Sequence, residues 1–328
     1  LSDLARSLAT LDLIFAMASL ATSESWARPI VDQSRVFKIE AGRHPIVESA
    51  LNKAGSPFVA NDCQLTAELG GAAITLLTGP NMAGKSTFLR QNALIAILAH
   101  MGSFVPASTA HIGMVSQVFS RVGASDDLAR GRSTFMVEMT ETANILHNAS
   151  ERSLILMDEI GRGTSTFDGL SLAWASAVHL AEEVKAFTLF ATHYFELTTL
   201  PEDYKQVSNV HLDATEHNDH IVFLHSIQEG PASRSYGLQV AKLAGMPKPV
   251  VDAAKLKLHE LESNASDTSA SMQVVSAAKA TLKPVIASPQ ADMFAIAEHP
   301  AISKLSTIDP NDLSPKQALE LLYELKGL

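Results

Sequence analysis

The segment Gly79–Ser86 constrains the fold of this chain more than any other feature of its sequence. It reads Gly-Pro-Asn-Met-Ala-Gly-Lys-Ser, which fits the phosphate-loop pattern of a glycine, four variable residues and Gly-Lys-Ser. An apolar run, 72–78, precedes it, and a long aliphatic segment, 86–100, follows it. A strand that enters a glycine turn and leaves it as a helix points backbone N–H groups and the positive helix terminus at an anion. We therefore predict a nucleotide-phosphate site formed by Gly79, Pro80, Asn81, Met82, Ala83, Gly84, Lys85, Ser86 and Thr87.

Two further strand ends carry the side chains that phosphate hydrolysis requires. The apolar segment 154–157 ends in Asp158 and Glu159, and His193 follows the apolar segment 187–191. We expect Ser86 and Asp158 to hold Mg²⁺, Lys85 to reach the β and γ oxygens, and Glu159 to deprotonate the attacking water. His193 is expected near the γ-phosphate, although a histidine at a strand end is commonly a solvated turn residue. The sequence thus predicts Mg²⁺-dependent conversion of ATP to ADP.

Alternating apolar runs and helical patterns predict an α/β fold. The runs at 154–157 and 187–191 flank a helical pattern at 170–184, which is typical of a parallel sheet covered by helices. Segments 207–212 and 221–227 predict an antiparallel hairpin at the sheet edge, so we expect a mixed, mostly parallel sheet. Short strands and turns are expected over 36–65, and a helix-turn-helix broken at Gly245 is expected over 235–261.

The two ends of the chain have their own patterns. Leu4, Leu8, Leu11 and Phe15 form one stripe of an N-terminal helix that requires a partner. Residues 263–305 have the Ser-, Ala- and Pro-rich composition of a linker, and a short helix with an apolar stripe is predicted from 314 to the end. That helix either docks on another copy of the chain or packs back on its own domain.

Composition limits the partners. The chain has 25 Lys and Arg against 35 Asp and Glu, a net charge of −10, which argues against a general clamp on nucleic-acid phosphates. The single Cys63 cannot form an internal disulfide and is expected to be a buried small hydrophobe in a reducing compartment. No run of 18 uncharged apolar residues occurs, so we expect a soluble chain without a membrane partner. Because the chain starts at Leu1, inside a helical pattern and without an initiator Met, we also expect a fragment of a longer protein.

Five segments together resemble the ATPase domain of the MutS family of DNA mismatch-repair proteins, within the ABC ATPase superfamily. They are 79–86, 131–139, 154–166, 191–197 and 235–238. The resemblance implies a P-loop NTPase fold in which two domains pair head to tail, so that Ser133 contacts the partner's γ-phosphate. From sequence alone Ser133 is equally the N-cap of the following helix, and both roles are compatible.

The same resemblance implies further site residues. Phe58 would stack on adenine and His225 would reach the base from the hairpin, whereas from sequence alone they are ordinary core and strand residues. A loop at the dimer seam would contain Arg162, Thr164, Ser165 and Asp168. A short peptide in the tail, with Gln290, Met293 and Phe294, resembles those that dock on the replication sliding clamp, and its match is short enough to arise by chance.

The resemblance also implies an order of domains. We expect the end of a helical lever at 1–30, the ATPase domain at 31–234, a dimer-buttressing helix-turn-helix at 235–262, a linker at 263–305 and an oligomerisation helix at 306–328. The implied partners are a second copy, or three through the last helix, a MutL-like repair protein, the sliding clamp, and mismatched DNA bound by a part absent from this chain. The implied location is the bacterial cytoplasm, at the nucleoid.

Three other functions compete with this interpretation. An ABC transporter motor would require a Leu-Ser-Gly-Gly-Gln signature, which the chain lacks. A MutS paralogue that suppresses recombination would carry a nuclease-associated domain where this chain has a linker and a helix. A nucleotide-dependent interaction module without turnover would not require Lys85, Asp158 and Glu159 together.

Overall fold

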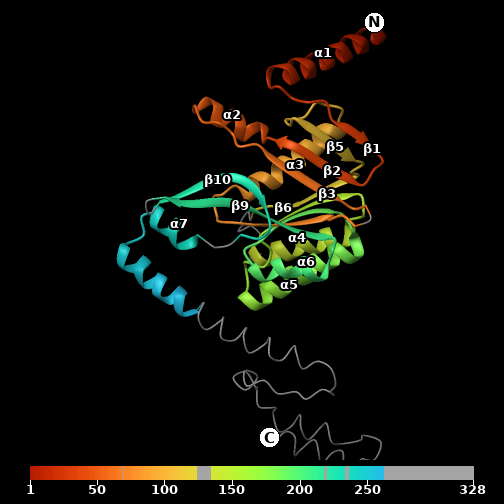
Figure 1. Ribbon diagram of the computed structural model, residues 1–328. Helices are drawn as coiled ribbons and strands as arrows, with labels where there is room; N and C mark the ends of the chain where they lie inside the picture. The colour runs from red at the N-terminus through yellow and green to blue at the C-terminus, as the bar shows by residue number, and fades with distance from the viewer. Residues whose placement is uncertain (69, 124–133, 218–219, 233–235, 262–328) are drawn as a thin grey trace, which may run out of the picture. The chain divides into compact units, whose positions relative to one another are not determined.

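The computed structural model describes residues 1–68, 70–123, 134–217, 220–232 and 236–261 (Figure 1). The chain divides into two compact units, Leu1–Leu256 and Lys257–Leu328. Ser133, the tail peptide with Gln290, Met293 and Phe294, the linker and the terminal helix all lie outside the described residues.

A mixed sheet is the centre of the first unit. Among the described residues its six strands follow the order β10-β9-β4-β8-β7-β6, and every neighbouring pair is parallel except β9 and β10. The bounds are β4 (Ile74–Thr78), β6 (Gln117–Arg121), β7 (Ser153–Asp158), β8 (Phe187–Ala191), β9 (Val207–His217) and β10 (His220–Glu229). The predicted mostly parallel sheet and its antiparallel edge hairpin are therefore confirmed.

Helices cover both faces of this sheet, which explains why β4, β7 and β8 are continuous apolar runs. Leu154 and Leu156 pack in one core with α3 (Lys85–His100), whereas Ile155 and Met157 pack in a second core with α5 (Thr166–His179). Helix α4 (Thr134–Asn148) joins the second core, and a π-helical turn, η2 (Leu180–Val184), extends α5. The short η3 (Phe195–Thr199) and α6 (Leu200–Asp203) follow β8.

The helix predicted over 170–184 begins four residues earlier than expected, at Thr166. Ser165 is its N-cap, and its side chain accepts a hydrogen bond from the Asp168 backbone at 3.3 Å. Its continuation through η2 agrees with the predicted end at residue 184.

A second sheet is formed by strands that precede the phosphate loop in the sequence and by one strand that follows it. Its order is β1-β5-β2-β3, with β1 (Ile30–Asp32), β2 (Val36–Gly42), β3 (Asn61–Thr66) and β5 (Thr109–Gly113). Cys63 is buried in β3, as predicted, and burial raises the pKa of its thiol.

The expectation of only strands and turns over 36–65 is wrong, because α2 (Pro45–Lys53) lies in this stretch. His44 is the N-cap and accepts from the Val47 backbone, while Pro45 occupies the first turn, where its missing N–H costs nothing. The His44-Pro45 pair therefore starts a helix rather than breaking the chain.

Helix α1 (Ser2–Ser23) confirms the predicted N-terminal helix. The stripe of Leu4, Leu8, Leu11 and Phe15 is 58–70% exposed in the described structure, as expected for a helix that lacks its packing partner. By length and composition α1 also qualifies as one candidate membrane span among the described residues, a weak criterion that core helices of soluble proteins and signal sequences also meet.

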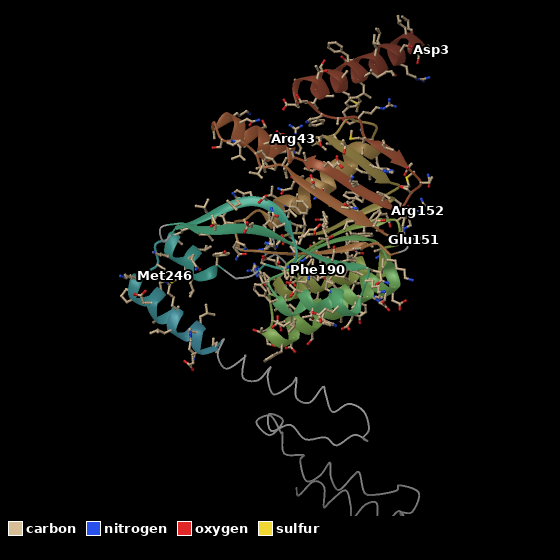
Figure 2. All side chains as sticks on the ribbon, in the orientation of Figure 1. Asp3, Arg43, Glu151, Arg152, Phe190 and Met246 are labelled. Atoms are coloured by element: carbon tan, nitrogen blue, oxygen red, sulfur yellow. The ribbon has the colours of Figure 1, made fainter. Side chains whose placement is uncertain are left out.

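One arginine connects the end of α1 to α2. Arg43, labelled in Figure 2, directly precedes His44, the N-cap of α2. It donates hydrogen bonds to the carbonyls of Glu24 and Ser25, at 3.2 and 3.0 Å, and forms a 2.9 Å ion pair with Glu48. Because both charged side chains are mostly buried, this contact fixes the residues that directly follow α1 to the first turn of α2.

Two helical segments lie within residues 236–261, the stretch where a helix-turn-helix is predicted. Helix α7 (Gly237–Leu243) is followed by a turn in which Gly245 has φ of +84°, and residues 248–261 are helical.

Candidate functional site

The phosphate loop connects β4 to α3 through three residues with positive φ. They are Gly79 at +131°, Met82 at +72° and Gly84 at +111°. A Cβ at Gly79 would lie 2.9 Å from the Leu212 carbonyl oxygen of β9, so the turn requires glycine both for its backbone angle and for space. Gly84 is the N-cap of α3, and the loop therefore places the positive end of α3 at the turn.

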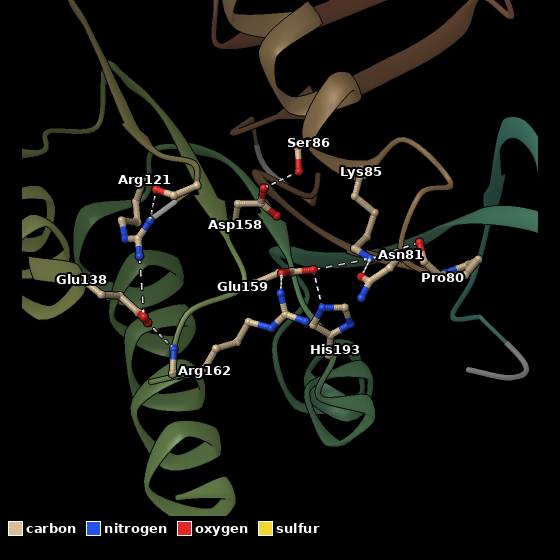
Figure 3. Close-up of polar contacts among 12 residues, drawn as sticks. Pro80, Asn81, Lys85, Ser86, Arg121, Glu138, Asp158, Glu159, Arg162 and His193 are labelled. Carbon is tan, nitrogen blue, oxygen red and sulfur yellow. Dashed lines mark hydrogen bonds and ion pairs between the residues drawn. The ribbon is translucent and has the colours of Figure 1, made fainter. Parts of the chain in front are cut away.

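Lys85 bends back into this loop, where it is 5% exposed. Its Nζ donates to the carbonyl oxygens of Gly79 at 2.8 Å and Pro80 at 3.3 Å, and to Asn81 Oδ1 at 3.5 Å (Figure 3). Burial lowers the pKa of Lys85, and the nearby carboxylates of Glu159 and Asp158 oppose that shift. The amine is therefore held among loop atoms at the position where the phosphate-loop pattern predicts an anion.

Ser86 and Asp158 form the next contact along the sheet edge. The Ser86 hydroxyl donates to Asp158 Oδ2 at 2.5 Å, and Asp158 Oδ1 is buried without a hydrogen-bond partner. Burial raises the pKa of Asp158, and the bond from Ser86 partly offsets it. An unpaired carboxylate oxygen beside a hydroxyl fits Mg²⁺, which prefers oxygen ligands and takes few of them from the protein. Groups of three or more His, Cys, Asp or Glu able to hold a metal do not occur in the described part of the chain.

Glu159 lies at the junction between the phosphate loop and the next strand end. Its backbone has φ of +59°, and its carboxylate contacts Arg162 and His193 and forms a 3.7 Å ion pair with Lys85 (Figure 3). Burial opposes ionisation, but the His193 hydrogen bond and the charges of His193, Arg162 and Lys85 outweigh it and lower the pKa of Glu159. The expected convergence of Glu159 and His193 at one sheet edge is therefore present.

A cavity of about 260 Å³ adjoins the other side of the phosphate loop. Phe58 and His225 both line it, together with Met82, Ala83, Gly84 and Thr87 of the loop and α3. A shift in the β9–β10 register separates Phe223 from Ile227, and His225, with φ of +54°, lies at this irregularity. Its Nδ1 hydrogen bonds with the Ala83 carbonyl at 2.7 Å. Residues 167 positions apart in the chain thus meet at one cavity beside the phosphate loop.

Of the four residues expected in a loop at a dimer seam, Arg162, Thr164 and Ser165 lie in the loop after Glu159, whereas Asp168 lies in the first turn of α5. Arg162 contacts Glu159, and Ser165 caps α5 while donating to the Asp168 carboxylate at 2.7 Å. Thr164 lines a surface pocket with Arg162 and His193. Arg162 thus brings this loop against the Glu159 carboxylate, which also contacts Lys85 and His193.

Sequence reasoning missed a buried charged pair that supports this loop. Glu138 of α4 accepts a hydrogen bond from the Gly161 backbone and lies 3.6 Å from Arg121 of β6. Both side chains are about 5% exposed. Tyr194 also donates to the Gly161 carbonyl at 3.0 Å. The signal that could have revealed this pair is the acidic residue Glu138 among the apolar residues of the helix predicted from residue 134.

The sheet order, the strand–glycine turn–helix unit and the side chains at its edge define a P-loop-type α/β domain. Comparison with known families assigns residues 75–262 to MutS domain V and residues 295–328 to the DNA mismatch repair protein MutS C-terminal region. The chain belongs to the MutS family of DNA mismatch repair proteins.

Two relatives, both named DNA mismatch repair protein MutS, illustrate the similarity. The protein of Cereibacter sphaeroides (strain ATCC 17029 / ATH 2.4.9) is 54% identical over 324 residues, which cover 99% of this chain and 36% of the relative. The protein of Dinoroseobacter shibae is 55% identical over 331 residues, 100% of this chain and 37% of the relative. The chain thus spans little more than a third of the length of the curated relatives it matches.

Proposed function

We propose that this chain binds ATP with Mg²⁺ and hydrolyses it to ADP and phosphate. The observation that carries the proposal is the convergence of the Lys85 amine, the Ser86–Asp158 pair and the Glu159–His193 contact at one sheet edge. Ligands of open α/β sheets bind at the carboxyl ends of the strands, which is where these groups lie.

Each side chain has a role that its surroundings support. Ser86 and Asp158 would hold Mg²⁺, which when bound neutralises charge on the phosphate oxygens. Lys85 would exchange its loop carbonyl partners for the β and γ oxygens. Glu159, kept ionised by His193, Arg162 and Lys85, would accept a proton from the attacking water, and His193 would hold that carboxylate beside the γ-phosphate. Phe58 and His225 would enclose the base.

The site is proposed to be completed by a second copy of the chain, with Ser133 acting in trans and the seam loop with Arg162, Thr164, Ser165 and Asp168 at the interface. Phe167, directly after the start of α5, is 82% exposed, and Phe195, two residues after His193, is 40% exposed. Large apolar side chains beside a charged site favour burial against a partner.

In the whole protein, the nucleotide state is proposed to control a clamp on mismatched DNA that another part of the protein forms. The helix-turn-helix would buttress the dimer and the terminal helix would extend it to a tetramer. The tail peptide would dock on the sliding clamp, and a MutL-like protein would read the nucleotide state. The proposed location is the bacterial cytoplasm, at the nucleoid.

Paired variants test binding and hydrolysis separately. Lys85→Ala is expected to abolish ATP binding, whereas Glu159→Gln should still bind ATP and slow hydrolysis by about 10²-fold or more, the usual loss on removing a general base. Normal hydrolysis by Glu159→Gln would refute the assigned base. Nucleotide binding without turnover in the wild-type chain would favour the interaction module.

The trans contribution of Ser133 is tested by mixing. ATP turnover per chain should rise with protein concentration if the site is shared between copies. Ser133→Ala and Lys85→Ala should each be inactive alone, and their mixture should recover activity because one site in each mixed dimer is intact. No recovery would assign Ser133 to capping of its own helix.

A further inference from the structure

The turn after β7 holds Glu159 in an unusual backbone conformation. Glu159 has φ of +59°, in the left-handed region that residues with a side chain rarely adopt. Its backbone N–H donates to the Ala191 carbonyl at 2.9 Å, so the turn begins at a fixed point beside the end of β8. Because such conformations persist only where the surroundings determine them, the contacts on the far side of the turn determine how firmly the Glu159 carboxylate is held.

Those contacts converge on Gly161, two residues later. The Gly161 N–H donates to the carboxylate of Glu138, and the Gly161 carbonyl accepts a hydrogen bond from the Tyr194 hydroxyl at 3.0 Å. The two bonds hold the peptide groups on both sides of the Gly161 Cα, whose φ is +90°. Ile160, between Glu159 and Gly161, is 1% exposed in the second core. We call Glu138, Tyr194 and the Gly161 backbone that they bind the Gly161 anchor.

Close backbone contacts surround the Gly161 anchor. A Cβ at Gly161 would lie 2.5 Å from the Gly169 carbonyl oxygen in α5, and a Cβ at Gly169 would overlap the Tyr194 hydroxyl. A Cβ at Gly163 would lie 2.7 Å from the Cβ of Phe135, at the start of α4. The turn is thus packed directly against α4 and α5, so its position depends on both helices.

The residues next to the Gly161 anchor are the ones that contact the Glu159 carboxylate. Arg162 directly follows Gly161 in the chain and contacts Glu159. His193 directly precedes Tyr194 and contacts the same carboxylate (Figure 3). The turn after β7 and the segment after β8 are therefore joined twice, by the His193–Glu159 contact and by the Tyr194–Gly161 bond. Two connections restrict rotation of one segment against the other, which a single contact would permit.

We propose that Glu138 and Tyr194 are positioning residues for ATP hydrolysis, which hold the Glu159 carboxylate beside the γ-phosphate through the backbone of Gly161. The proposal rests on the proposed function, to which it adds residues that determine the rate of hydrolysis and not the affinity for ATP. A general base must lie within hydrogen-bond reach of the water that it deprotonates. A misplacement of about 1 Å can cost about 10²-fold in rate, so the backbone that carries the base matters as much as the base.

Tyr194→Phe removes one hydroxyl and keeps the ring, so it tests the Gly161 anchor with little change in packing. The full chain with this change should bind a non-hydrolysable ATP analogue within about twofold of the wild-type affinity, because Lys85 and Ser86 are unchanged. Its kcat should fall about tenfold, through misplacement of the base. Hydrogen–deuterium exchange of the nucleotide-free chain should be faster than in wild type over residues 159–165, a measurement that does not depend on turnover.

Thr188→Val is the matched control. The Thr188 hydroxyl is fully buried in β8, the strand that leads to Tyr194, and donates to the Ala186 carbonyl at 3.2 Å. The change therefore removes a buried hydroxyl–carbonyl bond from the same part of the fold and leaves the bonds of Gly161 in place. Thr188→Val should lower Tm while keeping the wild-type kcat and the wild-type exchange of the turn after β7.

A pair of double variants tests Glu138 without leaving Arg121 buried and unpaired, because Arg121→Met removes that charge from both. Arg121→Met with Glu138→Gln keeps a side-chain oxygen that can accept from the Gly161 N–H, and its kcat should be close to that of wild type. Arg121→Met with Glu138→Met lacks this acceptor, and its kcat should be about tenfold lower at the same affinity for the analogue.

Three results would overturn the proposal. They are an unchanged kcat in Tyr194→Phe, equal kcat values in the two double variants, or a loss of kcat in Thr188→Val as large as that in Tyr194→Phe. The last result would show that any weakening of this region slows turnover. Failure of the proposed function has a different signature, because the wild-type chain then hydrolyses no ATP or Lys85→Ala hydrolyses it as fast as wild type, and the positioning role is refuted with it.

Discussion

Replacing Glu138 with alanine should destabilise the protein far more than its distance from the phosphate loop suggests. The change leaves Arg121 buried, at 5% exposure, without its buried carboxylate, and leaves the Gly161 backbone N–H without its acceptor. Breaking a buried ion pair by removing one partner costs about 3–5 kcal/mol, because the remaining charge is uncompensated. Arg121 keeps the Gly123 carbonyl at 2.7 Å and Glu141 at 3.1 Å, so we expect the lower end, about 3 kcal/mol.

Thermal and urea denaturation of the purified chain measure this effect. For a domain of this size about 3 kcal/mol corresponds to a decrease in Tm of roughly 6 to 12 °C. Glu141→Ala is the matched control, because it removes the other carboxylate that pairs with Arg121. The Glu141 side chain is 49% exposed, so its loss should cost less than about 1 kcal/mol after solvent screening.

Comparing the stability losses of the two variants tests whether burial determines how much each carboxylate contributes through Arg121. Equal, small losses of stability in Glu138→Ala and Glu141→Ala would refute the reasoning, since they would show that Arg121 is solvated or finds another partner. A large loss in Glu138→Ala that Arg121→Met restores in the double variant would confirm that the uncompensated charge is the cause.

Three further outcomes are expected. Hydrogen bonds from Ser34, together with His111, lower the pKa of Asp32 from 3.8 to about 2, so the folded state binds fewer protons than the unfolded state between these values. The stability from Asp32 is thus present above its unfolded-state pKa and is lost as the pH falls toward 2, so Asp32→Asn should reduce the pH dependence of the urea midpoint over that interval. Phe58→Ala should weaken ATP binding by about 1–3 kcal/mol, the usual value of base stacking, with turnover at saturating ATP little changed, as a competition assay would show. Gly161→Ala should lower stability more than Gly55→Ala. Both glycines have positive φ, but a Cβ at Gly161 would lie 2.5 Å from a backbone oxygen, whereas a Cβ at Gly55 would meet open space. Equal Tm values of the two variants would contradict this prediction.

The sequence was sufficient to predict the phosphate loop and its sheet because local and global signals agree there. The apolar runs that become β4, β7 and β8 are buried on both faces and therefore lack alternation. Strand β4 leads into the phosphate loop, and β7 and β8 lead to Asp158 and His193. The hairpin of β9 and β10 has strands of ordinary pattern on both sides of a polar turn, so it was equally accessible.

Helix α2 and strands β5 and β6 were not predicted, for different physical reasons. Helix α2 depends on His44 as a cap, which is uncommon, and on Pro45, whose usual meaning is a break. Strands β5 and β6 have five residues each and mixed burial, so they carry no clear period. Their neighbours in the sheets determine them.

The contacts that support the site could not be predicted from the sequence, because they depend on segments that are distant in the chain. Arg121 and Glu138 come from a strand and a helix, and nothing in either local pattern indicates the other. Gln91 has the pattern of an ordinary polar residue of a helix, and only the fold shows that it is buried, beside the cavity that Phe58 and His225 line.

Arg43 anchors α1 at one end only, through the carbonyls of Glu24 and Ser25 that directly follow the helix. Helix α1 has 22 residues and so extends about 33 Å from its anchored end. Its base is fixed to α2, two of whose side chains line the cavity beside the phosphate loop. If α1 and α2 move as one body, a tilt of about 10° at α2 displaces the far end of α1 by about 6 Å, given that length. A small displacement at the cavity wall would thus become a displacement of about one helix turn at the far end of α1.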